Sequence, residues 1–481
     1  MLLAFDVGTS VLKGGLFEMS GAPVSRAEIP LALIAHPDPL WHEADALTWI
    51  AALGEVAARL GVPGAGRIDA VVVSGNGPTL VPTDAEGNPL SNAMTWMDRR
   101  CVSEARIVSE KSGVPIDPTF YLPKAYWFYR NRPDVYERAR YFFSCPEFVE
   151  YVLTGVPVTF LPAPQFTRYI WDRELIAALG MAPEKFPPFI ASGRIVGAVS
   201  GKGERATGIP AGVPVVSGGP DFVVSLLGTG TVFPGRACIR SGTSEGINLC
   251  ARFPVEDRRL MCLGHIAEGC WNISGIVSTT GKALEWFKNA TGRSEASYER
   301  VFEDAGGAPP GADRLIFLPY LAGERAPLWD PRARGTFIGL TLNHGMREMT
   351  RAVVESAGYA IRDVIEVMEE IGLSVQDLRI TGAPARSRLW NQIKADITGR
   401  RILLPALPDA DLAGDACLAL YALGAFDSLA GASESIVKIG EVFEPDAQRK
   451  KLYDELFLLY RESYTSLRPV FDKLSAPRSQ T

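Results

Sequence analysis

The N-terminal segment carries residue types that can grip a phosphate group. Two strand-like apolar runs, at residues 2–5 and 11–17, flank a turn with the sequence Asp-Val-Gly-Thr-Ser at residues 6–10. Backbone N–H groups and hydroxyls in such a turn can face an anion. The carboxylate of Asp6 would repel phosphate, so its place beside the turn predicts a divalent cation between them. An ordinary hairpin turn is the alternative, because short motifs often occur by chance.

A second hairpin with the same order of features begins near residue 237. Residues 237–250 have the pattern of a strand, a turn of Gly, Thr and Ser, and a second strand. Two halves that each begin with a phosphate-facing hairpin imply a duplicated α/β unit with a nucleotide bound between the halves. The sequence therefore predicts two domains, residues 1–236 and residues 237–481.

The elements around these hairpins follow an α/β order. Residues 46–60 form an amphipathic run that predicts a helix, and residues 68–74 predict a buried strand. A strand at 215–217 runs into a Gly-Gly-Pro-Asp turn that ends at Asp221, where helical periodicity begins. Alternation of helix and strand is typical of α/β folds, which bind ligands at the carboxyl ends of their strands. Further helices are predicted at residues 347–371, 388–398 and 409–423.

Composition and charge exclude several classes of protein. The chain has 481 residues, a length typical of two or three domains, and a formal net charge of −6, which argues against a nucleic-acid binder. No apolar run of about twenty residues could span a membrane, and the N-terminus lacks the basic region of a signal peptide. Seven scattered cysteines without a Cys-x-x-Cys pair indicate reduced thiols, as in a cytoplasmic protein.

Taken in order along the whole chain, several segments resemble the FGGY carbohydrate kinases, and among them the xylulokinases and glycerol kinases most. The longest segment is Pro-Tyr-Leu-Ala-Gly-Glu-Arg-Ala-Pro-Leu-Trp-Asp-Pro-Arg-Ala-Arg-Gly at residues 319–335. The resemblance implies two actin-like (ribonuclease H-like) domains with a cleft that binds ATP, Mg²⁺ and a small sugar or polyol. The shorter segments lie at residues 6–10, 219–221, 241–244 and 387–390.

The resemblance also implies roles for individual residues. The family's catalytic base falls on Asp221, which would accept the proton of a substrate hydroxyl as its oxygen attacks the γ-phosphorus. A helix N-cap is the alternative role for this aspartate. Asp6 and Asp221 would organise the metal ion. The implied phosphate and nucleotide contacts are Thr9, Ser10, Lys13, Gly242, Thr243, Gly339, Gly382, Ala383 and Ser387.

The chain departs from the family pattern mainly on the acceptor side. Asn76-Gly77-Pro78 stands where xylulokinases have Gln-Met-His and glycerol kinases have Gln-Arg-Glu. Thr119 replaces a tyrosine that contacts glycerol, and Phe222 follows the base where a polar residue is common. In the nucleotide turn, Pro384 replaces a glycine and removes a backbone donor. The implied acceptor contacts are Asn76, Gly77, Trp96, Thr119, Asp221 and Phe222.

These observations together predict an ATP-dependent kinase that phosphorylates a hydroxyl of a small sugar or polyol. The first candidate is a pentulose such as D-xylulose, and the alternatives are glycerol or another polyol, ribulose and gluconate. An actin-like or chaperone-like ATPase, or a pseudokinase that only binds, is the alternative to a kinase. Family members are often dimers or tetramers, so a homodimer is one expected state, although the sequence reveals no interface.

Overall fold

The computed structural model describes residues 1–62 and 66–475, which form two compact units. In their described parts, the N-terminal unit comprises Met1–Gly228, Gly264–Glu268 and Ala410–Ile436, and the C-terminal unit comprises Thr229–Leu263, Gly269–Asp409 and Val437–Thr481. The structure thus groups residues 410–436 with the N-terminal unit. The division into residues 1–236 and 237–481 stays a prediction.

The N-terminal unit contains strands β1–β12 and helices α1–α8, α13 and α14. Their bounds are β1 (Leu2–Val7), β2 (Val11–Phe17), β3 (Pro23–Pro30), β4 (Glu43–Ala44), α1 (Ala46–Arg59), β5 (Ala70–Gly75), β6 (Val81–Thr83), β7 (Ala93–Met94), α2 (Val102–Ser112), α3 (Tyr121–Asn131), α4 (Pro133–Arg138), β8 (Tyr141–Phe143), α5 (Cys145–Thr154), β9 (Thr159–Leu161), α6 (Arg173–Ala178), β10 (Phe189–Ala191), β11 (Ile195–Ala198), α7 (Gly201–Thr207), β12 (Pro214–Pro220), α8 (Asp221–Gly228), α13 (Ala410–Ala422) and α14 (Leu429–Ile436).

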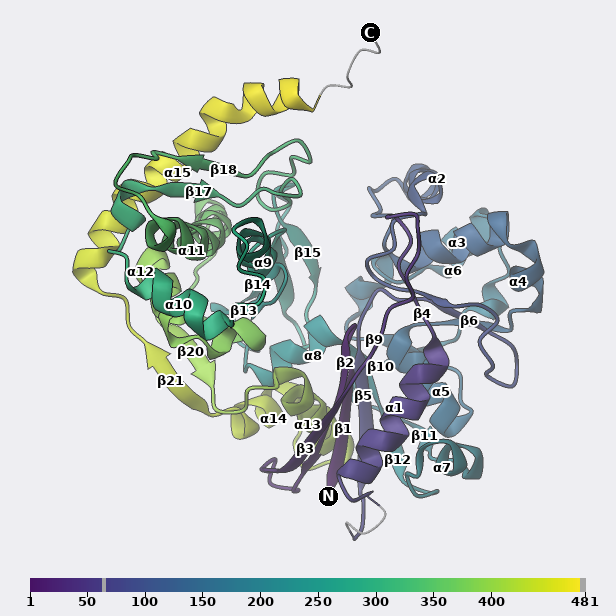
Figure 1. Cartoon of the computed structure of the whole chain (residues 1–481). Helices are drawn as coiled ribbons and strands as arrows, with labels where there is room; N and C mark the ends of the chain where they lie inside the picture. The colour runs from purple at the N-terminus through teal and green to yellow at the C-terminus, as the bar shows by residue number, and fades with distance from the viewer. Residues whose placement is uncertain (63–65, 476–481) are drawn as a thin grey trace. The chain divides into compact units, whose positions relative to one another are not determined.

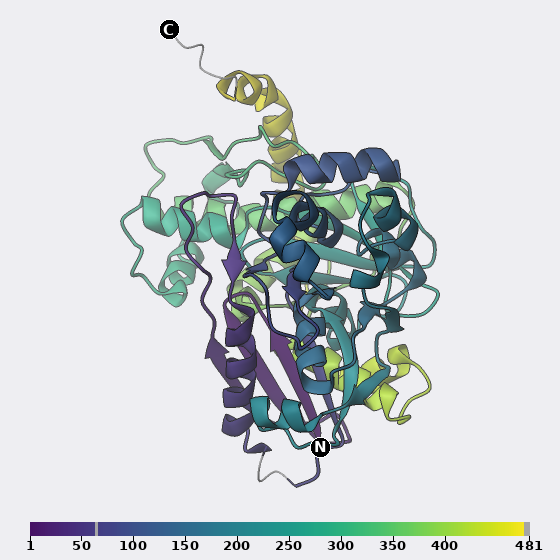
Figure 2. The same ribbon diagram turned by 90° about the vertical axis from the view of Figure 1, so that its right-hand side faces the viewer.

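The main sheet of this unit has six strands in the order β11-β12-β5-β1-β2-β3. β1 pairs antiparallel with β2 and parallel with β5, and β12 extends the parallel part. Because side chains alternate between the faces of a strand, Leu3 and Phe5 pack on the face that α1 and α5 cover. Asp6 and its register partner Ser74 lie on the other face, where Ser74 donates a hydrogen bond to Asp415 of α13 at 2.8 Å. Figures 1 and 2 both show α1, in purple, lying along the purple strands.

Helix α13 joins this sheet from a distant part of the sequence. It lies against α8, and the two backbones approach so closely that only glycine fits at two positions. A Cβ atom on Gly228 would lie 1.7 Å from the Ala410 carbonyl oxygen, and one on Gly414 would lie 2.1 Å from the Val224 carbonyl oxygen. One glycine on each helix, Gly228 and Gly414, therefore allows a close helix–helix contact.

The C-terminal unit is a second α/β unit. Its elements are β13 (Arg236–Ser241), β14 (Glu245–Ala251), β15 (Met261–Gly264), β16 (Trp271–Val277), α9 (Gly281–Ala290), α10 (Tyr298–Gly306), β17 (Ile316–Leu318), β18 (Thr336–Ile338), α11 (Met346–Glu370), β19 (Asp377–Thr381), α12 (Arg388–Thr398), β20 (Ile402–Pro405), β21 (Ile439–Phe443) and α15 (Ala447–Leu474).

The sheet of this unit repeats the central arrangement of the first. Its strand order is β15-β16-β14-β13-β19-β20-β21. β13 pairs antiparallel with β14 and parallel with β19, as β1 does with β2 and β5. Helix α11 buries Ile361 and Val364 against the sheet and Val353 in a second core with α15. The predicted α/β fold with two hairpin-led units is therefore confirmed.

Two predictions from composition can be compared with the described residues. No disulfide joins any of the seven cysteines, all of which lie in the described part of the chain. Within residues 1–62 and 66–475, no helix has both the length and the apolar composition that crossing a bilayer requires.

Candidate active site

The turn between β1 and β2 lies beside the carboxyl end of the parallel strand β5. Gly8 donates its N–H to the Val11 carbonyl at 3.0 Å, and a Cβ atom on Gly8 would lie 2.7 Å from that oxygen. On β2, Lys13 is the register partner of Asp6, and its Nζ lies 3.7 Å from Oδ2 of Asp6 and 3.9 Å from Oδ2 of Asp411. The turn thus places a buried carboxylate beside a lysine, an arrangement that suits a phosphate group with its counter-cation.

Two predicted contacts of different kinds meet at this turn. The indole N–H of Trp96, predicted to contact the acceptor, donates a hydrogen bond of 2.8 Å to the hydroxyl of Thr9, predicted to contact phosphate. The Trp96 side chain is 37% exposed, and the neighbouring Ser10 is exposed as well. The structure therefore brings the phosphate turn and the candidate acceptor region together within the N-terminal unit.

Asp221 is the first residue of α8 and directly follows β12. The pairing of β12 with β5 shifts register between Ser217 and Gly219, so the strand ends in a β-bulge. Bulges bend a strand and redirect the residues that follow, and they are common beside active sites. A Cβ atom on Gly218 would lie 2.0 Å from the carbonyl oxygen of Val73, and Gly219 has a φ of +151°. The Gly-Gly pair is thus needed for the backbone that presents Asp221.

The carboxylate of Asp221 contacts the backbone of its own helix. Its Oδ1 accepts the N–H of Phe222 at 2.5 Å. A helix N-terminus attracts negatively charged groups, so a carboxylate is a favourable residue at this position. This contact involves one of the two carboxylate oxygens and does not test the predicted role as base. The role as base stays a prediction.

Buried acids of α5 support the bulge from behind. Gly218 donates its N–H to Oε1 of Glu150 at 2.9 Å, and Glu147 accepts the N–H groups of Ser144 and Phe160. Burial raises the pKa of Glu147 to about 7 and that of Glu150 well above its ordinary value. A protonated Glu150 still accepts the Gly218 hydrogen bond through Oε1, and it adds no second negative charge behind the base.

Asp6 and Asp221 lie near one buried thiol. Burial raises the pKa of Cys145 well above its ordinary value, and the charges of Asp6 and Asp221 raise it further. Mg²⁺ is commonly held by one or two carboxylates together with waters and substrate phosphates, and these two aspartates fit that set. The described residues contain no cluster of three or more His, Cys, Asp or Glu side chains suited to an all-protein metal site. The metal assignment stays a prediction.

Two of the predicted acceptor contacts have partners inside the protein. Asn76 is buried, and its Nδ2 donates a hydrogen bond to the Val7 carbonyl at 2.9 Å, while its Oδ1 accepts one from Thr79. The Thr119 hydroxyl donates to Oδ1 of Asp117 at 2.7 Å. Asn76 therefore fastens the segment after β5 to the end of β1. Acceptor contacts of both side chains stay predictions.

Gly77 and Phe222 border an aromatic wall beside Asp221. A Cβ atom on Gly77 would lie 2.6 Å from the Tyr121 hydroxyl and 3.5 Å from Cβ of Pro220, the residue before the base. The Phe222 ring is stacked with that of Phe166, at 6.1 Å between centroids and 24° between planes. The apolar character predicted from Phe222 thus extends over several rings.

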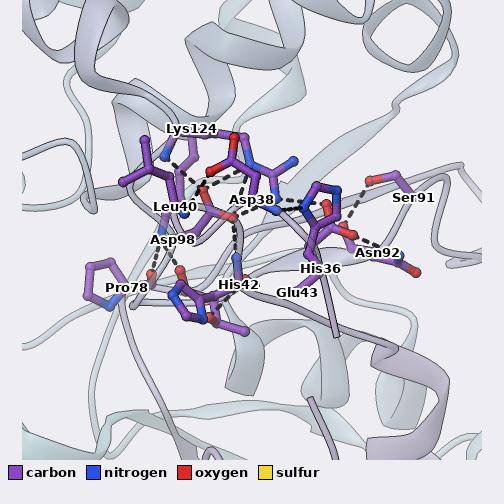
Figure 3. Close-up of polar contacts among 12 residues, drawn as sticks. His36, Asp38, Leu40, His42, Glu43, Pro78, Ser91, Asn92, Asp98 and Lys124 are labelled. Atoms are coloured by element: carbon purple, nitrogen blue, oxygen red, sulfur yellow. Dashed lines mark hydrogen bonds and ion pairs between the residues drawn. The ribbon is translucent and has the colours of Figure 1, made fainter. Parts of the chain in front are cut away.

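Sequence reasoning gave no role to a buried ionic network behind Trp96. Asp98 accepts the His42 N–H at 2.9 Å (Figure 3). It also accepts both Nε and Nη2 of Arg100, which in turn binds Glu43 at 2.8 Å. The Arg100 guanidinium carbon lies 3.5 Å from the centroid of the Trp41 ring. This network holds the chain segment that carries Trp96. The Trp-x-Asp pattern followed by an arginine two residues later was the available signal.

The C-terminal unit carries the predicted nucleotide turn between β13 and β14. A Cβ atom on Gly382, whose φ is +96°, would lie 1.9 Å from the Ser241 carbonyl oxygen, so this glycine adjoins the turn. The Thr243 carbonyl accepts the N–H of Lys282 at 3.0 Å, and a Cβ atom on Gly281 would lie 2.2 Å from the Gly242 carbonyl oxygen. The structure therefore brings the turn, Gly382 and the start of α9 together.

The remaining predicted nucleotide residues lie at two places. Ala383 begins a 3₁₀ turn, Ala383–Arg386, that contains Pro384, and the Ser387 side chain caps α12 by accepting the Trp390 N–H at 3.3 Å. Gly339 follows β18 with a φ of +91°, and a Cβ atom there would lie 3.1 Å from the Arg314 carbonyl oxygen. The nucleotide contacts of these residues stay predictions.

A buried ion pair beneath the second turn was also missed. Lys394 of α12 donates to Oε1 of Glu245 at 2.6 Å and to the Ser241 hydroxyl at 3.0 Å, and the Ser241 hydroxyl donates to the same Oε1 at 2.9 Å. Neither charged side chain is exposed. The three side chains tie α12 to the start of the turn, and the sequence offers no local signal for a contact between residues so far apart.

Comparisons with known proteins agree with this fold. Residues 1–228 match the N-terminal domain of the FGGY family of carbohydrate kinases, and residues 237–423 match its C-terminal domain. The xylulose kinase of Staphylococcus epidermidis is 29% identical over 96% of both proteins, and the gluconokinase of Bacillus subtilis is 28% identical over 90% of both. A ligand-bound xylulose kinase structure from Lactobacillus acidophilus covers 98% of this chain and 99% of its own, with a TM-score of 0.88 and 25% identity.

The matches to both domains of one kinase family identify the class of this protein as carbohydrate phosphotransferases. The chain belongs to the FGGY family of carbohydrate kinases. The prediction of a sugar kinase is therefore confirmed, in preference to an actin-like or chaperone-like ATPase.

Proposed function

We propose that the protein transfers the γ-phosphoryl group of ATP to a hydroxyl of a five-carbon ketose, with D-xylulose as the first candidate. Relatives named xylulose kinase that match nearly the full length of both proteins support this choice. Gluconate is the second candidate, since a gluconokinase matches over 90% of both proteins. Glycerol or another polyol and ribulose remain further alternatives.

In the proposed transfer, one bond forms at phosphorus and one breaks. The substrate oxygen attacks the γ-phosphorus, the bond to the β,γ-bridging oxygen breaks, and ADP leaves. Asp221 accepts the proton of the attacking hydroxyl. Thr9, Ser10 and Lys13 contact the phosphates from the first turn. Asp6 and Asp221 would hold Mg²⁺, which when bound neutralises charge on the phosphate oxygens.

The nucleotide side of the proposal lies on the C-terminal unit. Gly242 and Thr243 would offer backbone groups to the phosphates, and Gly382 with Ala383 would let the backbone approach the nucleotide closely. Ser387 would face the adenine, and Gly339 would line the same region. The contact between Gly382 and Ser241 supports this grouping.

The observation that carries the proposed role of Asp221 is the bulged end of β12. The backbone there requires two successive glycines and a hydrogen bond to a buried glutamate. An ordinary helix start needs neither of these features, and such unusual backbone is typical of functional sites. The charges of Asp6 and Asp221 both raise the pKa of the buried thiol of Cys145, which supports grouping the two carboxylates in one site. A base beside a phosphate turn is what in-line transfer to an alcohol requires.

The test is a screen of ADP release with MgATP and a panel of pentuloses, hexuloses, polyols and aldonic acids. We expect the highest kcat/KM with D-xylulose, and a new phosphate ester in the ³¹P NMR spectrum of the product. A maximum with gluconate would support the second candidate instead. ADP release that no acceptor stimulates would contradict the proposal and favour a protein that only binds.

We also propose that the protein forms a homodimer. Analytical ultracentrifugation, which measures the mass of the particle in solution, tests this proposal.

A further inference from the structure

The first turn of α3 contacts two successive residues of the segment that follows β5. Tyr121 and Lys124 are three positions apart, so their side chains project from the same side of the helix. The Tyr121 hydroxyl lies against Gly77, and the Lys124 ammonium reaches the carbonyl of Pro78. The proposed function places this segment beside the acceptor, and the inference below rests on that assignment.

Lys124 links two separate segments of the candidate acceptor region. Its side chain is 0% exposed, and Nζ donates hydrogen bonds to the carbonyl oxygens of Pro78 at 2.5 Å and Thr95 at 2.7 Å (Figure 3). Thr95 precedes Trp96, whose indole reaches the phosphate turn. A buried ammonium is costly unless it is well paired. Lys124 therefore fixes the spacing between the segment after β5 and the segment that carries Trp96.

Burial and neighbouring acidic groups have opposite effects on the pKa of Lys124. Burial lowers the pKa of Lys124 to about 7, whereas the nearby Cys101, Asp98 and Asp117 act in the opposite direction. The Asp98 carboxylate is itself engaged by Arg100. Burial of the Lys124 ammonium costs free energy, and the ammonium donates hydrogen bonds to carbonyl groups on two different segments. Lys124 therefore connects these two segments, unlike a solvated surface lysine.

Tyr121 fills the volume that a side chain at position 77 would take. Its hydroxyl is buried, would lie 2.6 Å from a Cβ on residue 77, and has no hydrogen-bond partner among the described residues. Its ring meets those of Phe160, Tyr169 and Trp171 nearly edge-on, so the hydroxyl cannot move aside easily. The tyrosine thus accounts for the absence of a side chain at this position of the Asn-Gly-Pro segment.

We infer that Tyr121 and Lys124 are positioning residues that shape the acceptor side of this kinase. Lys124 sets the distance between Pro78 and Trp96, and Tyr121 takes over the space beside Gly77. Both residues act on the protein segments around the acceptor. The phosphate turn with Thr9 lies in the same unit, whereas the proposed nucleotide turns of Gly242 and Gly382 lie in the other. Changes at either residue should therefore raise KM for the acceptor by a clearly larger factor than KM for ATP.

Compensation between residues 77 and 121 gives the sharpest test. In Gly77→Ala the new methyl group clashes with the Tyr121 hydroxyl, and we expect KM for the acceptor to rise at least tenfold. In Gly77→Ala/Tyr121→Phe the nearest ring atom is 3.7 Å from the new Cβ, so KM should return to within about threefold of Tyr121→Phe alone. Gly201→Ala is the matched control, because the nearest atom to its Cβ is 3.6 Å away at the end of the flexible Arg205 side chain.

A second test uses two lysines with similar bonding. Lys185 also donates to backbone carbonyls, those of Glu137 at 3.4 Å and Ala139 at 2.5 Å, but it contacts neither segment of the acceptor region. Lys124→Met should raise KM for the acceptor at least tenfold and KM for ATP by a clearly smaller factor. Lys124→Arg, which keeps charge and donors, should restore part of the loss. Lys185→Met should leave both KM values unchanged.

Two results would overturn the inference. Gly77→Ala could lower the melting temperature and leave KM for the acceptor at the wild-type value, or it could raise KM for ATP by the same factor. Either outcome, or a failure of Tyr121→Phe to compensate, would show that Tyr121 and Lys124 contribute only to core packing and do not position the acceptor region. Failure of the proposed function would appear separately, as wild-type ADP release that no acceptor stimulates, and would overturn both proposals.

Discussion

The Glu150 carboxyl accepts the backbone N–H of Gly218 at 2.9 Å, three residues before Asp221. This contact joins the interior of α5 to the bulge that ends β12. Its other oxygen, Oε2, has no hydrogen-bond partner among the described residues. An acid that uses one oxygen and is kept neutral by burial behaves as a fixed acceptor of a single hydrogen bond.

Two replacements of Glu150 should therefore show whether its role is to accept the Gly218 hydrogen bond or to carry a negative charge. Glu150→Gln keeps a carbonyl oxygen for Gly218, and we expect kcat within about threefold of wild type. Glu150→Leu leaves a buried N–H without an acceptor, which costs about 1–3 kcal/mol, and the bulge should shift, with a loss of at least tenfold in kcat. Steady-state kinetics and urea denaturation measure the two effects. Equal kcat in both variants would show that the contact does not position Asp221.

Removal of the base should stop transfer and spare nucleotide binding. In Asp221→Asn we expect kcat to fall by about 10²–10⁴-fold, the range that general-base catalysis typically supplies. ATP affinity, measured by calorimetry without acceptor, should stay within about threefold of wild type. An Asp221→Asn enzyme with near-wild-type kcat would refute the assignment. Glu204→Gln, an exposed acid in α7, is the control.

Asp6 should set the requirement for the metal ion. Asp6→Ala removes a buried carboxylate from the phosphate turn, so we expect a higher Mg²⁺ concentration at half-maximal rate and a lower kcat. Activity at fixed ATP is measured against free Mg²⁺, and chelation should abolish wild-type activity until Mg²⁺ is restored. Asp84→Ala, in an exposed turn of the same unit, should leave the titration unchanged. An unchanged titration in Asp6→Ala would remove Asp6 from the metal site.

Glu324 should contribute a pH dependence to folding stability. Its Oε1 accepts the N–H groups of Ser278 and Arg325, both at 2.7 Å, and burial raises its pKa from 4.5 to about 7. A raised folded-state pKa means that the native state binds the proton more tightly than the unfolded chain does. The stabilisation is therefore complete below pH 4.5 and is lost as the pH rises through about 7.

The variant Glu324→Gln tests this sign. Its Oε1 keeps both hydrogen bonds and its side chain does not titrate. Between pH 4.5 and 8, the unfolding free energy of the wild type should fall relative to that of the variant, by roughly 3 kcal/mol at most. Urea denaturation at several pH values measures it. A difference that is constant with pH would show that Glu324 does not titrate in this range.

Local features of the sequence were predictable because short-range patterns determine them. The strand at residues 11–17 and the helix at 388–398 coincide with β2 and α12, since apolar periodicity and capping residues mark both. The two Gly/Thr/Ser turns were visible for the same reason. In the first turn, Gly8 avoids a clash with the Val11 carbonyl, which is a requirement of the turn itself.

Contacts between distant residues could not be predicted in the same way. Nothing in the sequence indicated that the amide of Asn76 donates a hydrogen bond to the Val7 carbonyl of the adjacent parallel strand. Lys124 and Pro78, like Lys394 and Glu245, meet only because separate elements pack together. A single sequence without relatives gives the types of these residues and not their partners, so their positioning roles appear only in the folded chain.

The origin of α13 in residues 410–422 has a consequence for how the protein is made in the cell. The sheet of the N-terminal unit emerges from the ribosome early, yet α13, which packs on one of its faces, is translated only after more than four hundred residues. During that interval, Ser74 lacks its hydrogen bond to Asp415. The packing of α13 on the sheet is a late event between segments far apart in the sequence. Translation speed and chaperones therefore have a long interval in which to influence the yield of native enzyme.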